Sequence, residues 1–592
     1  NHLMGAAAAA ASASTGFYDH QIANSVRMQM GAGSRLRRTP SSAGNRATWS
    51  ISMWVKRAKL GDEQFLYEAG ASGDQDGRLR LVFTDADKIM VGTGNANLAT
   101  SSAVFRDTSS WYHIHWKNTG GTNTVHVNGL EVISVSCSGD TAVNNTVAQG
   151  IGCRGGSGDD TTSSLEGYIA EFLLFDGTAY SYTDVTDDKN GVLIPADPSG
   201  LTFGTNGTWL KFESSSDLGN DSSGNNNDWT ASNIATHDQM TDAPTFGSEG
   251  SANFPALSPL WKTPDMTFSE GNLKWSTSTN QRGVMSNWSV PLEGKFYWEY
   301  IPTAFGASSG DDSWCGLNIA TVDFTASRGG EGTSYSYGAN SGQKNIAGTK
   351  TSYGAAWGDD DKIGVAVDRV NDTIQFSKNG SWQGSAFAIP STGDLFPWIG
   401  SGGGTSAASG VINFGQDGTF AGLVTAGGNA DENGYGNFFY APPSGFLAMC
   451  SGNLSVAAEV DPAETDDDYP QKLFQPFIWT GDGNTTRSFT LNFKPDFSWA
   501  KQRSHTYQHI MYDTNRTYAT LQALGSNGTW AEGGGGDNAT NGYFSSSDSS
   551  GFSVNKGTAT TAGGSLTNSS STTFASWHWR VNGGTTSTNS TG

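Results

Sequence analysis

Three glutamates on expected strands could take part in catalysis. Cleavage of a glycosidic bond needs two carboxylates about 5–9 Å apart. On a strand this requires a spacing of two or four residues, because alternate residues share a face. Glu166 and Glu171 are five residues apart, so they point to opposite faces of an expected strand, and Glu299 stands alone on another. The sequence therefore predicts no catalytic pair on a strand.

Clustered aspartates next to glycines offer a second set of carboxylates. These clusters are Asp159-Asp160, Asp311-Asp312 and Asp359-Asp360-Asp361. Such loop oxygens can bind Ca²⁺, but the sequence has no EF-hand spacing, and acidic loops are usually solvated. A hydrolase would need the fold to bring two of these loop carboxylates together. We name no calcium site from the sequence.

Histidines on neighbouring expected strands suggest a metal site as one alternative. His113 and His115 share one face of a strand, and His126 follows on the next. Neutral imidazoles at this spacing can bind zinc. The favoured interpretation is that they are polar, outward-facing residues of a half-buried sheet. His505 and His509, near Asp513, are interpreted in the same way.

Other catalytic motifs are absent from the sequence. It has no phosphate-binding G-x-x-x-x-G-K-[ST] loop and no defensible Ser-His-Asp order. We therefore expect a protein that is not an enzyme, with no catalytic, cofactor-binding or metal-binding residues. Trp and Tyr side chains are the remaining binding candidates, since aromatic faces stack on sugars and anchor interfaces.

Short strands must position all of these residues. Trp49 to Val55 and Phe296 to Tyr300 alternate with a period of two, as expected of half-buried strands. The pairs Asn128-Gly129 and Asn379-Gly380 each separate two such runs. Both residues of an Asn-Gly pair tolerate positive φ, so the sequence predicts type I′ hairpin turns at these two places.

Composition supports the same fold class. The 592 residues include 78 Gly, and charged residues make up 15% and aromatic residues 11%. Disordered chains are poor in aromatic residues, and helical bundles are rich in Ala, Glu, Lys and Leu. We therefore expect a large all-β protein with helix below about 10%. The net charge of −22 repels phosphate backbones, which argues against a nucleic-acid partner.

Cysteine usage and hydropathy indicate where the chain folds. Its cysteines are Cys137, Cys153, Cys315 and Cys450, too few for a secreted disulfide scaffold. We expect reduced thiols in a protein made inside a cell, with a Cys137–Cys153 disulfide as the alternative. No apolar run approaches the roughly 20 residues of a membrane helix, and no export signal is visible. The Ala-rich start is either an arm that docks onto a partner or a frayed tail.

Changes in composition divide the chain into six segments. Pro, Gly, Asn and Asp concentrate in two of them, without strand periodicity, and these are expected to be connectors. The expected segments are an N-terminal attachment arm (1–24), a first β domain (25–195), a connector (196–268), a second β domain (269–416), an acidic connector (417–471) and a C-terminal β-rich domain (472–592).

Two stretches of the first β domain invite a comparison, residues 36–57 (LRRTPSSAGNRATWSISMWVKR) and 169–177 (IAEFLLFDG). With them, the domain resembles the laminin-G-like, concanavalin-type jelly rolls of tailed-phage virion proteins. Residues 203–207 (FGTNG) and 218–229 (LGNDSSGNNNDW) are similar to a connector found in phage tail fibres.

The second β domain contains a series of short stretches, 296–300 (FYWEY), 314–317 (WCGL), 361–368 (DKIGVAVD), 376–380 (FSKNG), 395–398 (LFPW) and 411–415 (VINFG). In this order they resemble the strand pattern of a SPRY-type β-sandwich. The last block, with 499–504 (WAKQRS) and 577–580 (WHWR), is similar to the C-terminal domain of the same phage proteins. The resemblance thus covers nearly the whole chain.

The resemblance implies a non-catalytic virion structural protein, a tail fibre or another external appendage that attaches to the host surface. It implies a homotrimer whose N-terminal arm binds other tail or capsid proteins, located on the virion after assembly in the host cytoplasm. Loops of the second and third domains are expected to contact a host glycan or receptor, without membrane insertion. The alternatives are a secreted protein that binds or degrades polysaccharide, and a purely architectural capsid or tail decoration.

Overall fold

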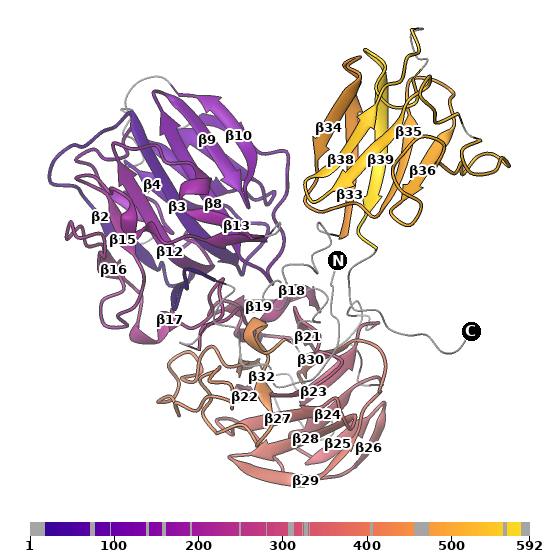
Figure 1. Ribbon diagram of the computed structural model, residues 1–592. Helices are drawn as coiled ribbons and strands as arrows, with labels where there is room; N and C mark the ends of the chain where they lie inside the picture. The colour runs from indigo at the N-terminus through magenta and orange to yellow at the C-terminus, as the bar shows by residue number, and fades with distance from the viewer. Residues whose placement is uncertain are drawn as a thin grey trace. The chain divides into compact units, whose positions relative to one another are not determined.

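Strands dominate the computed structural model (Figure 1). It describes residues 18–581 except 71–76, 95, 138–140, 157–160, 190–191, 248–249, 280, 306–312, 322–323, 325–329, 331, 403–406, 455–472, 535 and 561–564. The helical elements defined within these residues are the 3-10 turns η1 (Tyr182–Asp184), η2 (Pro198–Gly200), η3 (Thr236–Asp238) and η4 (Ser451–Asn453). The predicted all-β fold is therefore confirmed. None of the described helices is long and apolar enough to span a bilayer.

The chain divides after residue 455 into two compact units. Unit 1 begins with a sandwich of two sheets and a small ribbon. One sheet, in the order β10-β9-β8-β3-β12-β1-β17 with β15 beside β12, contains β1 (Ser25–Met28), β3 (Thr48–Arg57), β8 (Tyr112–Thr119), β9 (Thr122–Val127), β10 (Leu130–Ser136), β12 (Gly167–Asp176), β15 (Thr208–Leu210) and β17 (Gln239–Met240). The other, in the order β16-β2-β11-β4-β5-β6-β7, contains β2 (Arg35–Arg38), β4 (Gln64–Ala69), β5 (Leu79–Phe83), β6 (Ile89–Thr93), β7 (Ala96–Thr100), β11 (Gln149–Ile151) and β16 (Thr230–Ser232). The ribbon pairs β13 (Thr186–Lys189) with β14 (Val192–Pro195).

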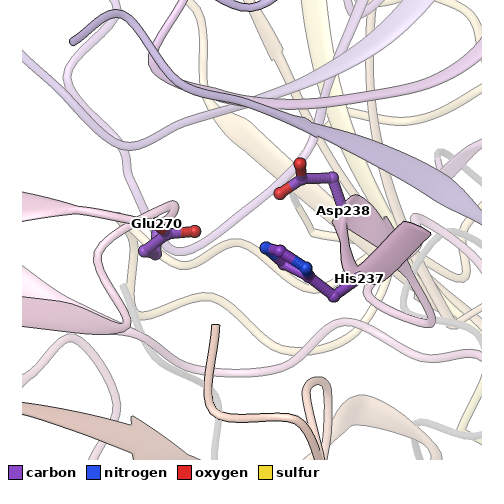
Figure 2. A group of neighbouring side chains, drawn as sticks. All are labelled: His237, Asp238 and Glu270. Carbon is purple, nitrogen blue, oxygen red and sulfur yellow. The ribbon is translucent and has the colours of Figure 1, made fainter. Parts of the chain in front are cut away.

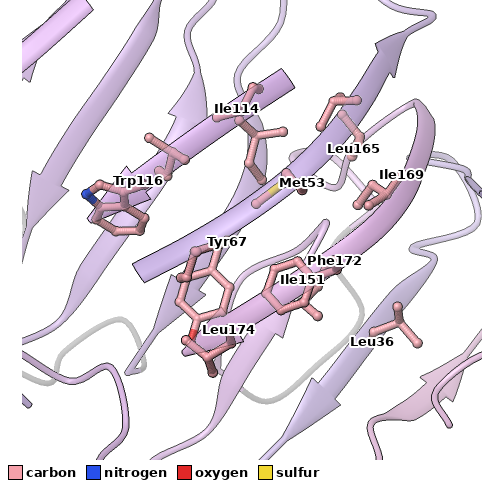
Figure 3. Packing of buried hydrophobic residues seen from close by; sticks show 14 of the residues in the cluster. Leu36, Met53, Tyr67, Ile114, Trp116, Ile151, Leu165, Ile169, Phe172 and Leu174 are labelled. Carbon is pink, nitrogen blue, oxygen red and sulfur yellow. The ribbon is translucent and has the colours of Figure 1, made fainter. Parts of the chain in front are cut away.

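The core of the first sandwich lies between its two sheets. Met53 and Ile114 contribute to it from β3 and β8, and Phe172 contributes from β12 (Figure 3). Trp54, the next residue along β3, belongs to a different buried cluster on the opposite side of the sheet. Because side chains alternate along a strand, β3 is buried on both of its faces.

The second sandwich of unit 1 also has two sheets. One, in the order β18-β21-β30-β23-β24-β25-β26, contains β18 (Leu257–Lys262), β21 (Gly283–Ser286), β23 (Trp314–Ile319), β24 (Tyr335–Gly338), β25 (Gln343–Ile346), β26 (Thr349–Ser352) and β30 (Leu395–Gly400). The other, in the order β19-β20-β31-β22-β27-β28-β29 with β32 beside β22, contains β19 (Met266–Ser269), β20 (Lys274–Thr277), β22 (Lys295–Phe305), β27 (Ile363–Asp368), β28 (Thr373–Lys378), β29 (Ser381–Ala388), β31 (Ala408–Asn413) and β32 (Leu447–Ala448).

Both Asn-Gly pairs form the hairpins that the sequence predicts. Asn128 and Gly129 have φ of 47° and 78° between β9 and β10. Asn379 and Gly380 have φ of 49° and 80° between β28 and β29. Two successive positive φ values define a type I′ turn, whose twist matches that of the flanking strands.

The segments expected to be connectors are largely built into the sandwiches. Residues 196–268 supply β15, β16 and β17 to the first sandwich and β18 to the second. Residues 417–454 supply β32, and their Phe420 and Phe438 side chains are buried. These strands have two to six residues, too short for a period of two to stand out among turn residues. The acidic stretch 461–468 lies outside the described residues.

A buried layer joins the two sandwiches of unit 1. Trp54 and Tyr168 from the first sandwich share an apolar cluster with Ile301 and Val411 from the second. The Tyr168 hydroxyl donates to the Gly271 carbonyl at 2.9 Å across this layer. The two sandwiches therefore form one packed body.

Unit 2 is a smaller sandwich. Its first sheet, in the order β33-β39-β35-β36, contains β33 (Phe474–Thr480), β35 (Phe497–Gln502), β36 (His509–Asp513) and β39 (Thr573–Trp579). Its second sheet, in the order β34-β38-β37, contains β34 (Thr486–Thr490), β37 (Tyr543–Asp548) and β38 (Gly551–Asn555). Trp479 and Phe574 of the first sheet pack with Phe552 of the second in the core.

Candidate functional site

Glu166, one of the strand glutamates considered from the sequence, is part of the buried layer between the sandwiches. Its carboxylate accepts the backbone N–H of Met30 at 2.9 Å and that of Gly271 at 3.4 Å. Burial raises the pKa of Glu166 to about 7, although both hydrogen bonds oppose this rise. Glu171 contacts other groups, so these two glutamates do not form a catalytic pair.

Glu299 has a structural position inside the second sandwich. Its carboxylate accepts the backbone N–H groups of Phe439 and Tyr440, each at 2.8 Å. Burial raises the pKa of Glu299 to about 7, against the effect of these hydrogen bonds. This side chain holds the segment after β31 against β22.

The three histidines of β8 and β9 lie in a row, but they are not a metal-ligand set. The ring centroids of His113 and His115 are 6.4 Å apart, and those of His115 and His126 are 6.2 Å apart. Three ligands of one metal ion need their ligand atoms within about 4.8 Å of one another. The described part of the chain does not place the nitrogens of these three histidines that close together. His113 and His115 are buried, which corrects the expectation of outward-facing side chains. Burial is the main cause that lowers the pKa of His113 to about 3.

The other predicted polar candidates are tied to separate partners. His509 accepts the indole N–H of Trp499 at 2.9 Å, and Asp513 pairs with Arg516. His505 contacts Ser504, so it does not join them as a ligand set. Asp361 pairs with Lys378 at the end of a hairpin. The pairs 159–160 and 311–312 lie outside the described residues.

One group of side chains in unit 1 could hold a metal ion by its ligand types. His237, Asp238 and Glu270 place their ligand atoms within 4.8 Å of one another (Figure 2). The buried Arg27 already supplies a cation to this group, since its guanidinium contacts Asp238 at 3.0 Å and Glu270 at 2.9 Å. Asp417 adds a third carboxylate at 2.8 Å. We interpret the group as a structural ion-pair cluster.

A pocket next to β12 brings together a histidine, two glutamates, a lysine and a tryptophan. It has a volume of about 150 Å³, and Glu171 and Trp209 line it together with His20 and Lys211. His20 Nε2 lies 2.6 Å from Glu171 Oε1, and the Trp209 indole N–H donates to the same oxygen at 3.3 Å. The ammonium of Lys211 lies 4.3 Å from the centre of the Trp209 ring. A larger hollow of about 360 Å³ is lined by residues 215–218, 228–231 and 234.

The local backbone explains how Glu171 reaches the pocket. The pairing of β12 with β3 shifts register between Ala170 and Leu173. Glu171 occupies this bulge with φ of 44°, a left-handed conformation that a non-glycine residue adopts at a cost. Bulges re-aim side chains and are frequent beside functional sites. The bulge therefore turns a carboxylate out of an otherwise apolar strand.

The electrostatics of the pocket centre on the His20–Glu171 pair. Burial by itself lowers the pKa of His20, but the hydrogen bond and the negative charge of Glu171 outweigh it and raise that pKa. An imidazole next to an aromatic ring and a lysine can hold hydroxyl or carboxylate groups of a small ligand.

Sequence reasoning did not find this pocket. His20 falls in the expected N-terminal arm, and Trp209 falls in the expected connector. Glu171 was considered only as half of a pair with Glu166. A charged residue inside the apolar run IAEFLLFDG was the one available signal, because such a residue is costly to bury unless it is paired.

Three segments of the chain match known domain families. Residues 31–186 match the Concanavalin A-like lectin/glucanases superfamily, residues 295–417 match the SPRY domain, and residues 469–592 match a domain of unknown function, DUF7483. The protein thus carries a concanavalin-like domain followed by a SPRY domain, as the sequence resemblance predicted. No curated protein matches the chain significantly.

Solved structures similar to parts of the chain have low sequence identity to it. The SPRY domain of human HERC1 is 18% identical, with 26% of this chain and 96% of that chain covered and a TM-score of 0.22. Stonustoxin is 17% identical, with 27% of each chain covered and a TM-score of 0.22. A putative carbohydrate binding protein from Bacteroides ovatus is 14% identical, with 36% and 58% covered and a TM-score of 0.27.

Proposed function

We propose that this chain is a non-catalytic structural protein of a tailed-phage virion, a tail fibre or another external appendage, that attaches to glycans or other receptors on the host surface. The concanavalin-like and SPRY domains support a binding role. The Glu171 pocket supplies a polar site beside an aromatic ring, which suits a sugar. The observation that carries the proposal is the order of the domains, which resembles that of phage tail proteins.

Attachment is tested with the full chain. Purified, fluorescently labelled protein is expected to bind cells of the phage host and to compete with adsorption of the virus. The loss of cell binding in a Glu171→Gln/Lys211→Ala double variant, relative to the wild type, shows how much the pocket contributes. Glu532→Gln in unit 2 is the matched surface control. Failure of the full chain to bind cells or to slow adsorption would favour the architectural alternative.

The assignment to a virion is tested separately. Mass spectrometry of purified particles is expected to detect the chain, and portal, tail-tube and terminase genes are expected next to its own. A particle that lacks the chain would contradict the assignment.

Polysaccharide degradation is the second candidate function, and the pocket favours it through one observation. Glu171 and Glu213 both line the pocket, so two carboxylates reach one hollow. Release of reducing ends from polysaccharides by the purified chain, abolished by Glu171→Gln, would establish this function in place of simple binding.

A further inference from the structure

The outer face of the first sheet of unit 2 is rich in aromatic side chains. Phe574 and His578 of β39 point into the core, where the His578 ring lies 4.3 Å from that of Phe552. The alternate residues 575, 577 and 579 therefore point away from the core. These outward positions of β39 include Trp577 and Trp579, which are half-buried.

Strand register aligns further rings and apolar groups on the same face. Across the sheet, partners in register point to the same side. The first row is Phe474, Trp579, Phe497 and Asp513; the second is Pro476, Trp577, Trp499 and Met511; the third is Ile478, Ala575, Lys501 and His509. We call this three-row surface the aromatic face.

The rings of the aromatic face hold one another in place. Centroids are 4.9 Å apart for Phe474 and Trp579, 5.3 Å for Trp579 and Phe497, and 5.6 Å for Trp577 and Trp499. At its edge, Phe474 is 39% exposed and Ile478 is 69% exposed. A ligand that binds here meets a preorganised surface, which lowers the entropic cost of binding.

Polar groups around the rings are largely satisfied within unit 2. The Lys501 ammonium donates to the backbone carbonyls of Gln502, His505 and Tyr507. Asp513 is paired with the guanidinium of Arg516. Residues 473–581 contain seven Lys and Arg against six Asp and Glu, in a chain with a net charge of −22. On the aromatic face itself, the charges of Lys501 and Asp513 are of opposite sign, so the face is nearly neutral, which disfavours an ionic ligand.

Two hydrogen-bond donors remain available on this face. Within the described residues, the indole N–H groups of Trp577 and Trp579 donate to no protein acceptor, and neither is a buried polar atom. Flat apolar rings next to free donors match the apolar faces and hydroxyl groups of a sugar.

The size of the aromatic face argues against a second copy of the chain as its occupant. Four strands about 4.8 Å apart and three rows about 7 Å apart span roughly 14 by 14 Å, on the order of 200–400 Å² with side-chain margins. A stable protein interface buries about 800 Å² on each partner. The face is large enough for a short segment of polysaccharide.

We propose that the aromatic face binds an uncharged stretch of a glycan chain, which stacks on Trp577, Trp579 and Trp499. This inference rests on the proposed attachment function and moves the contact in unit 2 from loops to a sheet face.

The experiment uses the full chain and an array of immobilised bacterial polysaccharides. Trp577→Ala and Trp499→Ala are each expected to weaken binding about tenfold to a hundredfold, because each removes a large apolar contact. Ile478→Glu places a charge on an exposed edge position of the face and guards against misfolding of the Trp variants. Trp530→Ala, a half-buried Trp in a loop of unit 2, is the matched control and is expected to bind as the wild type does.

The outcomes separate this inference from the function on which it rests. Loss of binding in the three face variants, with normal binding by Trp530→Ala, supports the face. If the wild type binds glycans and only Glu171→Gln/Lys211→Ala weakens binding, attachment stands and the aromatic face is excluded. A wild type that binds no polysaccharide overturns both. If the face variants bind glycans normally but no longer form the oligomer that the wild type forms, the face is occupied by another copy of the chain.

Discussion

Buried carboxylates in this protein differ in their partners. Glu166 and Glu299 accept backbone N–H groups without a nearby countercharge at hydrogen-bond distance. Their pKa values rise to about 7 because burial outweighs those hydrogen bonds. Glu171 instead has His20 beside it. Identical side chains therefore serve as structural anchors at two positions and as a pocket group at the third.

The raised pKa of Glu299 predicts a pH dependence of stability. A carboxyl whose pKa is higher in the folded state binds protons more tightly when folded. Its contribution to the free energy of unfolding therefore decreases as the pH rises from 4.5 to about 7. Glu299→Gln removes this titration. The difference in free energy of unfolding between wild type and variant is expected to change by about 3 kcal/mol over this range. Urea unfolding at pH 5 and pH 8 measures it.

Asp394→Asn, at an exposed loop position of the same sandwich, is the control for Glu299→Gln and is expected to show no such change. A pH-independent difference between wild type and Glu299→Gln would contradict the prediction.

The His20–Glu171 pair predicts a shift that NMR can measure. Glu171→Gln removes the negative charge but keeps His20 partly buried, so the pKa of His20 is expected to fall. Titration of the imidazole proton signals checks this. Glu213→Gln, whose side chain is 61% exposed and pairs with Lys211, should leave the pKa of His20 nearly unchanged. Equal shifts in both variants would show that the ion pair does not hold the proton.

The ion-pair cluster around Arg27 joins short strands and turns of unit 1. β1 carries Arg27, η3 carries Asp238, the turn between β19 and β20 carries Glu270, and Asp417 follows β31. Burial lowers the pKa of Arg27, but the three carboxylates outweigh it and keep that pKa above its usual value. One guanidinium thus links four segments that are up to 390 residues apart.

Removal of this guanidinium is expected to destabilise unit 1 strongly. Arg27→Ala leaves buried carboxylates without a countercharge, which typically costs about 3–5 kcal/mol. Arg106→Ala removes a guanidinium whose side chain is 61% exposed, and a loss below about 1 kcal/mol is expected. Thermal and urea unfolding of both variants provide the comparison. A loss as small in Arg27→Ala as in Arg106→Ala would mean that the cluster contributes little.

At the scale of the whole molecule, the proposed function implies repeated contacts with a surface. Linked weak sites raise avidity by about 10²–10⁴ when several can bind at once. The concanavalin-like domain, the SPRY domain and the aromatic face of unit 2 offer different surfaces for such contacts. An oligomer would multiply each of them.

The resemblance to fibre proteins predicts a homotrimer. No heptad repeat in the sequence enforces threefold association, so domain faces would have to make the contacts. Sedimentation equilibrium or light scattering at micromolar concentration is expected to give three times the chain mass of 62.3 kDa. A stable monomer, together with a single copy in each particle, would refute this prediction.

Local patterns in the sequence determined the fold class and particular turns. The Asn128-Gly129 and Asn379-Gly380 hairpins follow from the positive φ that these residues tolerate, and alternation identified strands such as β22 and β3. These features depend on residues next to one another in the chain. The SPRY and concanavalin-like domains were predicted from several such patterns in a fixed order.

Tertiary structure alone decided the sites, because their residues are far apart in the chain. His20, Glu171 and Trp209 meet only after β12 bulges and β15 pairs beside it. Both faces of β33 carry apolar side chains. One face has Phe474 and Ile478, and the other has Phe477 and Trp479, so the sequence does not indicate which of them faces outward. The second sheet of unit 2 decides this by burying Trp479, which leaves the opposite set to form the aromatic face.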